Sequence, residues 1–253
     1  MIISLRRVVK LLLLVLHLLF GLLQTLLLSL RAIPSYHPLY RRAVRRWMQQ
    51  LCAIFALQIY IQRQDVACGS TKSRVVVANH ISWLDIPVIA AVENVVFLSK
   101  AEVRRWPLIG WLAARSGTRF IARGVQGAAM AAERELQQAL AEGVSPLFFP
   151  EGTTSDGKQV RRFLRPLFNS AISAQVAVQP LALRYLQNGR AHPTVPYIGD
   201  QTLWHNLWQL LGEPSVEVEV TLLPYIDDCR DNRELARRAQ LAIARVVTPD
   251  GHE

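Results

Sequence analysis

The sequence predicts an α/β domain with a mixed central sheet flanked by helices, preceded by an N-terminal hydrophobic segment of two helices. From about Asp65 onward, short β-branched or aromatic runs alternate with stretches of helical composition. This alternation is typical of an α/β domain with a largely buried sheet. Before Asp65, long apolar runs dominate the chain. We therefore divide the chain into a helix pair, residues 1–64, and a larger domain, residues 65–253.

The first apolar run, Leu11–Leu30, has 20 residues without a formal charge, which is long enough to cross a bilayer as a helix. Arg6, Arg7 and Lys10 precede it. A signal peptide also begins with basic residues and an apolar run, but no small-x-small cleavage site follows this one. We expect a retained membrane anchor.

The second apolar run, Trp47–Ile61, predicts an amphipathic helix in the membrane interface, with Trp47 and Tyr60 at headgroup depth. The basic hinge between the two runs contains Arg31, Arg41, Arg42, Arg45 and Arg46. This cluster is richer than the one before the first run, which favours a domain on the cytoplasmic face of the cell (inner) membrane. A hairpin buried in only one leaflet fits the charge on both sides equally well.

The larger domain is expected to contain six strands and five helices. The strands are Arg74–Ala78, Val95–Ser99, Thr118–Ala122, Pro146–Phe149, Val176–Tyr185 and Val216–Leu223. The helices are Trp83–Ala91, Leu108–Ser116, Gly127–Glu142, Phe163–Ala174 and Asn232–Val247. Asp231 or Asn232 is a suitable N-cap for the last helix, and Asn188–Pro196 is expected to be a surface loop.

The composition points to an anionic surface as the partner. The chain has 29 basic and 19 acidic residues, a net charge of +10 and 51% hydrophobic residues, so both charge and apolar content favour membrane lipids. Only four of the basic residues are lysines, and arginine suits bidentate phosphate contacts. Because no helix-turn-helix, zinc-finger or aromatic RNA-binding pattern is found, no nucleic acid is expected. The three scattered cysteines indicate a reducing compartment and no metal site.

The most informative segment runs from Asn79 to Asp85 and pairs His80 with Asp85, just after a predicted strand. Five residues turn a regular helix by about 500°, so the two side chains would not share a helical face. They can meet if His80 ends a strand–helix turn and Asp85 lies in the first helical turn. Asp85 would then fix the imidazole tautomer and leave the other ring nitrogen to accept a proton. A surface histidine beside a capping aspartate is the alternative.

A second polar cluster, from Phe149 to Gly157, follows another predicted strand. Its amides and hydroxyls are suited to hold an anion, although an ordinary Gly-rich turn would look the same. Arg119 and Arg123 lie along a third predicted strand. Because side chains alternate along a strand, these two residues, four positions apart, point to the same face. Two guanidinium groups on one face are suited to bind a phosphate. The alternative is that they lie in solvent on an edge strand.

Together these segments resemble the glycerolipid acyltransferase family in four ordered blocks across roughly residues 74–185. The first block, Asn-His-x4-Asp, is matched by Asn79, His80 and Asp85. The second is matched by Gly117, Phe120, Ile121 and Arg123, and the third by Phe149, Pro150, Glu151, Gly152 and Thr153. The fourth, an apolar strand that ends near a proline, is matched by Val178, Gln179 and Pro180. The hydrophobic helix pair is similar to the family's membrane-seating motif.

The resemblance implies a membrane-bound O-acyltransferase with no cofactor and no metal, whose domain covers residues 65–253. It implies that His80 is the general base and Asp85 its orienting carboxylate, and that the acyl donor is acyl-CoA or acyl carrier protein. It assigns Arg123, Glu151, Gly152 and Thr153 to acceptor binding. Lys100, or backbone amides near the turns, is a candidate for stabilising the oxyanion. Nothing in the sequence indicates the oligomeric state.

The acceptor expected first is 1-acyl-sn-glycerol-3-phosphate, which would give phosphatidate. Two departures from the family pattern bear on it: Thr154 stands where members acting on lysophosphatidate often have arginine, and Ala122 stands where the second block often has an acidic or amide residue. The alternative acceptor is another lysolipid such as lyso-ornithine lipid. A membrane-tethered lipid hydrolase is the alternative of another class, but no nucleophile elbow is found.

Overall fold

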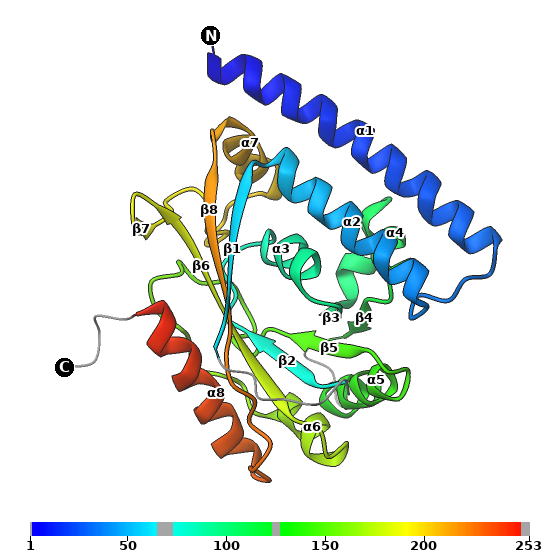
Figure 1. Ribbon diagram of the computed structural model, residues 1–253, viewed down its shortest axis with the longest axis vertical. Coiled ribbons are helices and arrows are strands. Elements are labelled where there is room, and N and C mark those ends of the chain that lie inside the picture. The colour runs from blue at the N-terminus through cyan, green and yellow to red at the C-terminus, as the bar shows by residue number, and fades with distance from the viewer. Residues whose placement is uncertain (1, 65–72, 123–126, 249–253) are drawn as a thin grey trace.

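The protein is built on one mixed sheet (Figure 1). The computed structural model describes residues 2–64, 73–122 and 127–248. Within them the sheet has the strand order β1-β8-β6-β2-β5-β3-β4, and β7 pairs with β6. The strands are β1 Leu57–Arg63, β2 Val75–Ala78, β3 Val95–Lys100, β4 Arg119–Ile121, β5 Ser145–Phe148, β6 Val178–Gln187, β7 Arg190–Ala191 and β8 Val216–Leu222. Neighbours from β6 to β4 run parallel, as do β1 and β8, whereas β6 is antiparallel to β8 and β7.

Helices cover both faces of this sheet, and two apolar cores result. The helices are α1 Ile2–Leu30, α2 Pro38–Ile54, α3 Asp85–Val92, α4 Ile109–Arg115, α5 Ala128–Ala141, α6 Asn169–Ser173, α7 Leu203–Gly212 and α8 Asn232–Val247, with 3₁₀ turns η1 Ala101–Arg105 and η2 Pro166–Phe168. Val76 and Ala78 of β2 face the core beneath α2, α3 and α7, whereas Val75 and Val77 face the core beneath α5, α6 and α8. The prediction of a mixed α/β sheet flanked by helices is therefore confirmed.

The N-terminal region differs from the prediction after Ile54. The expected helix Trp47–Ile61 is wrong in its second half, because α2 ends at Ile54 and Leu57–Arg63 forms β1 in parallel with β8. Ala56 takes a left-handed conformation, with φ of 56°, at the reversal between the two. The expected helix Phe163–Ala174 is reduced to η2 and α6, and α7 was not expected. The division at residue 64 stays a prediction, although the sheet itself begins at Leu57.

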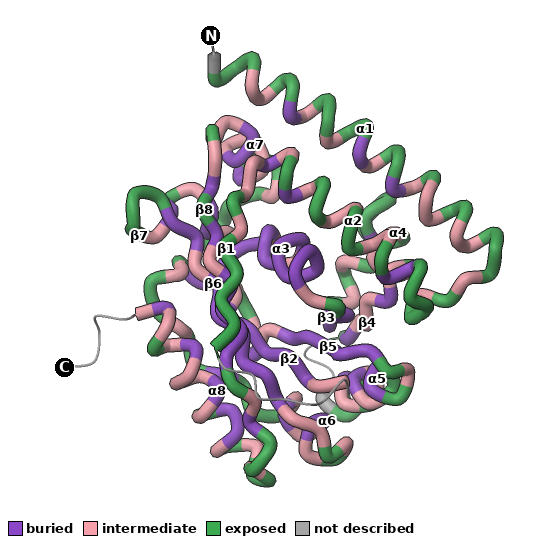
Figure 2. The backbone as a smooth tube through the Cα atoms, in the orientation of Figure 1, coloured by how far each residue is buried: buried purple, intermediate pink, exposed green. Residues whose placement is uncertain are grey.

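The longest helix, α1, lies along the outside of the body (Figure 1). Its stretch Ile3–Leu30 is long and apolar enough to cross a membrane, by length and composition. Near its start, Arg6 donates to the Gly212 carbonyl at 2.7 Å. Midway, the ring of His17 stacks on Trp47 of α2 at 4.6 Å between centroids. Figure 2 shows α3 and the central strands buried and much of α1 exposed.

Two arginines of the predicted basic hinge bind backbone carbonyls of the body, Arg41 from a buried position and Arg45 from an exposed one. Arg41 is 9% exposed and donates to the side chain of Asn94 and to the carbonyls of Val95 and Ser116. Arg45 donates to the Ala91 carbonyl at 3.0 Å. These bonds join α2 to α3 and to the start of β3, so the two charges stabilise the fold.

Candidate active site

The candidate site lies where two neighbouring parallel strands end. His80 follows β2, and the 149–157 loop follows β5, which pairs with β2. The carboxyl ends of parallel strands meet at one edge of a sheet, which is where open α/β sheets place their ligands. Asn79 fixes the exit of β2, because its side chain exchanges hydrogen bonds of 2.9 and 2.8 Å with the backbone of Leu183 in β6.

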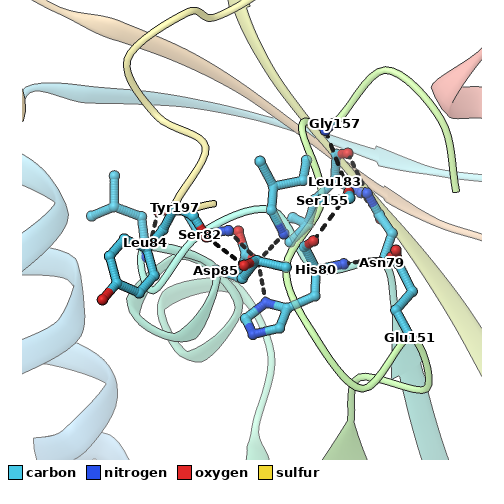
Figure 3. A network of polar contacts seen from close by, with 12 residues as sticks. Asn79, His80, Ser82, Leu84, Asp85, Glu151, Ser155, Gly157, Leu183 and Tyr197 are labelled. Atoms are coloured by element: carbon cyan, nitrogen blue, oxygen red, sulfur yellow. Dashed lines mark hydrogen bonds and ion pairs between the residues drawn. The ribbon is translucent and has the colours of Figure 1, made fainter. Parts of the chain in front are cut away.

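His80 and Asp85 are in direct contact (Figure 3), which is the first of the two arrangements that the sequence left open. The Nδ1 atom of His80 lies 2.7 Å from Oδ2 of Asp85. The chain reverses between them, so Asp85 starts α3 and its Oδ2 also accepts from the backbone of Ile81 and Ser82, at 2.7 and 3.0 Å. Asp85 therefore ties the turn before α3 to the first residue of the helix, and the same oxygen atom holds the imidazole.

This contact determines which nitrogen of His80 faces outward. A carboxylate only accepts hydrogen bonds, so Nδ1 carries the proton in the neutral ring and Nε2 holds a free lone pair. The imidazole is 20% exposed, whereas the Asp85 carboxylate is fully buried. Phe149 stacks on the imidazole, with ring centroids 3.9 Å apart and planes 11° apart. The ring is thus fixed on one side by a carboxylate and on one face by an aromatic side chain.

Tyr185 is a third member of this group that the sequence did not indicate. It lies in β6, a hundred residues after Asp85, and its hydroxyl donates to Asp85 Oδ1 at 2.8 Å. Burial, together with the neighbouring carboxylate, raises the pKa of Tyr185 well above its ordinary value, so the hydroxyl keeps its proton. Because the pairing of β6 with β2 brings these residues together, no local sequence signal could have found Tyr185.

Glu151 lies beside the pair but faces the backbone. Its two oxygens accept from the backbone N–H of His80 at 2.8 Å and of Arg161 at 3.1 Å. It is 7% exposed, and burial raises the pKa of its carboxyl from 4.5 to about 6. In this structure Glu151 therefore ties the loop after β5 to His80. Its assignment to acceptor binding stays a prediction.

The rest of the 149–157 loop wraps around the same turn. Gly152 has a φ of 74°, the left-handed region that favours glycine, and Thr153 is exposed. Ser155 donates its backbone N–H to the His80 carbonyl at 2.8 Å. Thr154 donates its hydroxyl to the carbonyl of Tyr197, whose own N–H binds the Ile81 carbonyl at 3.0 Å. The residue after Glu-Gly-Thr thus joins the site loop to the segment before α7.

The predicted cationic residues are less closely gathered. Lys100 is exposed at the carboxyl end of β3, two strands from β2, and within the described ranges no hydrogen bond or ion pair joins it to His80, Asp85 or Glu151. Arg119 is paired with Glu142 and, at 3.6 Å, with Glu135, so it does not face an open phosphate site. Arg123 lies outside the described residues. No group of three metal-ligating side chains occurs in the part of the chain that is described.

Comparison with known proteins determines the family. A family model described as Acyltransferase matches residues 57–184, half of the chain. This chain belongs to the glycerolipid acyltransferase family. The match includes the His80–Asp85 pair and the loop after β5. The acyltransferase is therefore an enzyme of the O-acyltransferase class, as the four blocks predict.

Its relatives carry two kinds of name. The acyltransferase is 41% identical over 207 residues to the lyso-ornithine lipid O-acyltransferase of Pseudomonas aeruginosa. The matched region covers 81% of this chain and 78% of the relative. The acyltransferase is 31% identical to the 1-acyl-sn-glycerol-3-phosphate acyltransferase of Neisseria gonorrhoeae, with 78% of each chain covered. The crystal structure of the 1-acyl-sn-glycerophosphate acyltransferase PlsC from Thermotoga maritima has the same fold, with a TM-score of 0.66, 20% identity and 96% of each chain covered.

Proposed function

We propose that this acyltransferase moves a fatty acyl group from a thioester donor, acyl-CoA or acyl carrier protein, to the free hydroxyl of a lyso-ornithine lipid. The sequence placed lysophosphatidate first, but the relatives support the alternative acceptor. The Pseudomonas relative is 41% identical, and a second lyso-ornithine lipid O-acyltransferase, from Brucella abortus, is 39% identical over 57% of the chain, against 31% for the gonococcal enzyme. Thr154, in place of the arginine typical of lysophosphatidate enzymes, agrees with this choice.

The observation that carries the mechanism is the contact of 2.7 Å between His80 Nδ1 and Asp85. It leaves the Nε2 lone pair of a partly exposed ring to take the proton from the acceptor hydroxyl. The hydroxyl oxygen then attacks the thioester carbonyl carbon and forms a tetrahedral intermediate. When the C–S bond breaks, the leaving thiolate takes the proton back from the imidazolium. Asp85 stabilises the imidazolium between these two transfers, and no acyl-enzyme and no cofactor take part.

Acceptor binding falls to the exposed part of the same edge. Thr153 lies on the surface of the loop, and a row of basic residues follows it, Lys158, Arg161, Arg162 and Arg165, all exposed. We assign this row, with Arg123, to the anionic part of the headgroup, and Lys100 or loop amides to the oxyanion. Glu151 acts by holding the backbone of His80 in place.

We further propose that α1 seats the enzyme in one leaflet of the membrane. Because α1 is bonded to α7 near its start and to α2 midway, a helix that crossed the bilayer would carry parts of the folded body into it. Its exposed apolar residues, among them Leu12, Leu16, Leu19 and Leu23, are suited to lie in the acyl region with the body outside. The basic character of the chain favours the cytoplasmic face.

The test is an acceptor panel. Purified enzyme in detergent would be given a labelled thioester donor with lyso-ornithine lipid, lysophosphatidate or no acceptor, and labelled diacyl product would be measured. We expect lyso-ornithine lipid to be acylated at least tenfold faster than lysophosphatidate. Faster acylation of lysophosphatidate would reverse the acceptor assignment. Release of free fatty acid at the same rate without an acceptor would instead indicate a hydrolase.

A further inference from the structure

The connection between β3 and β4 presents an apolar surface that the fold leaves uncovered. It consists of η1, the turn Trp106–Leu108 and α4. Trp106, Leu108, Ile109 and Trp111 are between 36% and 55% exposed. Four large apolar side chains within six residues exceed the scattered exposed residues of an ordinary protein surface.

Arginines surround these apolar side chains. Arg104, Arg105 and Arg115 are exposed, and Glu102 is the only acidic residue between Ala101 and Ser116. Arg115 lies over the ring of Trp111 at 5.8 Å. Among the described residues, no carboxylate forms an ion pair with any of the three arginines. We call these seven side chains, four apolar and three basic, the 104–115 patch.

The patch is held rigidly. Gly110 is buried where α4 crosses η1, and a Cβ atom there would lie 2.3 Å from the Arg104 carbonyl oxygen. Its N–H donates to the Trp106 carbonyl at 2.9 Å, and Leu108 has a φ of 61°. The close packing turns the side chains of the 106–109 turn outward, away from the interior.

The position of the patch relates it to both the site and α1. It begins at the carboxyl end of β3, the same edge at which His80 follows β2, and β3 is two strands from β2, or about 10 Å along the sheet. The other end of α4 adjoins the end of α1, since Ala114 and Arg115 line one pocket with Ser29 and Ile33. The patch therefore lies between the exposed apolar face of α1 and the edge that carries His80.

We infer that the 104–115 patch is a second membrane contact, which inserts its tryptophans, Leu108 and Ile109 at headgroup depth while its arginines bind anionic lipid phosphates. Tryptophan favours this depth, and each arginine near an anionic surface adds to binding. With α1, the patch would give the enzyme two points of contact, so that the active-site edge faces the bilayer in which the lysolipid resides. This inference rests on the proposed acyl transfer at a membrane.

An acidic carrier protein could also bind three arginines, but the apolar side chains favour lipid. At Arg115 the patch adjoins the end of α1, whose exposed apolar residues extend over most of its length. A carrier protein would leave this neighbouring apolar face unexplained. A carrier protein and a lipid bilayer can be told apart by experiment. A carrier protein can bind the patch when the enzyme is in detergent micelles, whereas micelles contain no anionic bilayer.

The first experiment measures depth. In full-length protein with Cys68→Ser and Cys229→Ser, a fluorophore would be attached to Ile109→Cys and the protein reconstituted into phosphatidylglycerol-rich vesicles that contain a headgroup nitroxide lipid. We expect quenching of more than half of the fluorescence. The matched control is Met130→Cys on α5, which is 63% exposed on the other face of the sheet and should stay unquenched. A label at 109 that behaves like the control in vesicle-bound protein would overturn the inference.

The second experiment measures turnover with acyl-CoA as donor. The variant Arg104→Glu/Arg105→Glu is expected to lose at least tenfold in rate on acceptor in anionic vesicles and less than twofold in neutral micelles. Arg230→Glu/Arg233→Glu, before and within α8, makes the same charge change and should keep the wild-type rate in both. Equal losses in vesicles and micelles would contradict the inference, and a loss confined to acyl carrier protein in micelles would indicate carrier docking. Quenching requires no turnover, so failure of the proposed acceptor would be seen separately.

Discussion

Asp85 is fully buried, and its charge is matched by donors on both oxygens. Oδ2 accepts from His80, Ile81 and Ser82, and Oδ1 accepts from Tyr185. A buried carboxylate with fewer partners would be destabilising. The same bonds that stabilise the charge also fix its direction, so the imidazole is oriented by a group that cannot itself rotate. Tyr185 thus helps to hold the carboxylate that contacts His80, and we expect it to act on His80 through Asp85 as a positioning residue.

Tyr185→Phe keeps the ring and removes only this donor. The carboxylate then holds the imidazolium more tightly, so we expect the acid limb of the kcat/KM profile to move to higher pH. At a pH on that limb the rate should fall about threefold to tenfold, because a hydrogen bond to a charged group contributes roughly 1.5–3 kcal/mol, only part of which reaches His80. The measurement is a pH–rate profile of the purified variant. An unshifted profile would exclude coupling through Asp85.

Glu151 predicts a pH dependence of stability. Burial raises the pKa of its carboxyl from 4.5 to about 6, so the folded protein binds this proton more tightly than the unfolded chain. The contribution of Glu151 is therefore most favourable below pH 4.5 and is lost as the pH rises through 6. At 1.36 kcal/mol per unit, the loss is about 2 kcal/mol.

Glu151→Gln does not titrate, so the stability of the variant relative to the wild type should rise by up to about 2 kcal/mol between pH 4 and pH 7.5. Denaturant unfolding in detergent at the two pH values measures this change. Gln cannot form one of the hydrogen bonds of Glu151, which changes the free energy of unfolding by an amount nearly independent of pH. Comparing the variant with the wild type at both pH values removes this constant amount. A constant difference at both pH values would show that the pKa is not raised.

At the level of elements, α7 connects α1 to the turn that holds His80. The indole N–H of Trp83, which lies between His80 and Asp85 in the chain, donates to Asn206 Oδ1 at 2.9 Å. The amide of Asn206, fully buried in α7, donates to the Thr194 carbonyl at 3.0 Å. At its other end α7 accepts the bond from Arg6 of α1 through Gly212. The turn that holds His80 is therefore braced by the helix that α1 packs against.

Asn206→Leu would leave the Trp83 N–H and the Thr194 carbonyl without partners. We expect the free energy of unfolding to fall by about 2–3 kcal/mol, since each unsatisfied buried group costs about 1–3 kcal/mol. Urea unfolding in detergent would measure it. The matched control on the same helix is Gln209→Leu, which should change stability by less than about 0.5 kcal/mol. Equal effects of the two substitutions would show that Asn206 has no special role.

The local sequence predicted elements well where one pattern determined them. Between β2 and β8 the strands β2 to β6 and β8 and the helices α3 to α5 follow the expected runs to within a few residues, whereas β7 and α7 were not expected and the helix at Phe163–Ala174 is shortened. α7 could also have been found, because Thr202 caps it by accepting from the His205 N–H and apolar residues recur at helical spacing from Leu203 to Leu211. By contrast, most of Leu57–Arg63 was assigned to a helix although Leu57, Ile59 and Ile61 recur at strand spacing, and its pairing with the distant β8 makes it a strand.

The same distinction applies to the site. His80, Asp85 and the loop after β5 lie within short motifs, and the folding of those motifs brings them together. Tyr185 comes from another strand, and the inward turn of Arg41 depends on α3 and β3, so neither could be inferred from neighbouring residues. Glu151 was assigned to acceptor binding, and the structure shows that its carboxylate binds the backbone of His80 and Arg161.

At the level of the whole molecule, α1 and the sheet edge define how the enzyme would meet a membrane. α1 is packed against the body from α7 to α4 (Figure 1), so its two ends should lie on the same side of the bilayer. The positions of the two ends therefore distinguish the one-leaflet arrangement from a crossing helix, whose ends would lie on opposite sides of the bilayer.

Cysteines introduced at Ser4 and Tyr36, both exposed near the ends of α1, test this arrangement in a background without the native cysteines. In sealed inside-out membrane vesicles, an impermeant maleimide should label both positions at similar rates, because both face the cytoplasmic side. Labelling of position 36 alone, with position 4 reached only after detergent is added, would establish a crossing helix and contradict the proposed seating.

The central claim is that His80, oriented by Asp85, takes the proton from the acceptor hydroxyl. The most direct measurement is the rate of labelled acyl transfer to lysolipid by His80→Ala, with Asp85→Asn beside it and unfolding midpoints confirming that both variants fold. We predict that His80→Ala loses about 10²–10⁴-fold in kcat/KM and that Asp85→Asn also loses activity. Wild-type turnover by a folded His80→Ala enzyme would contradict the account.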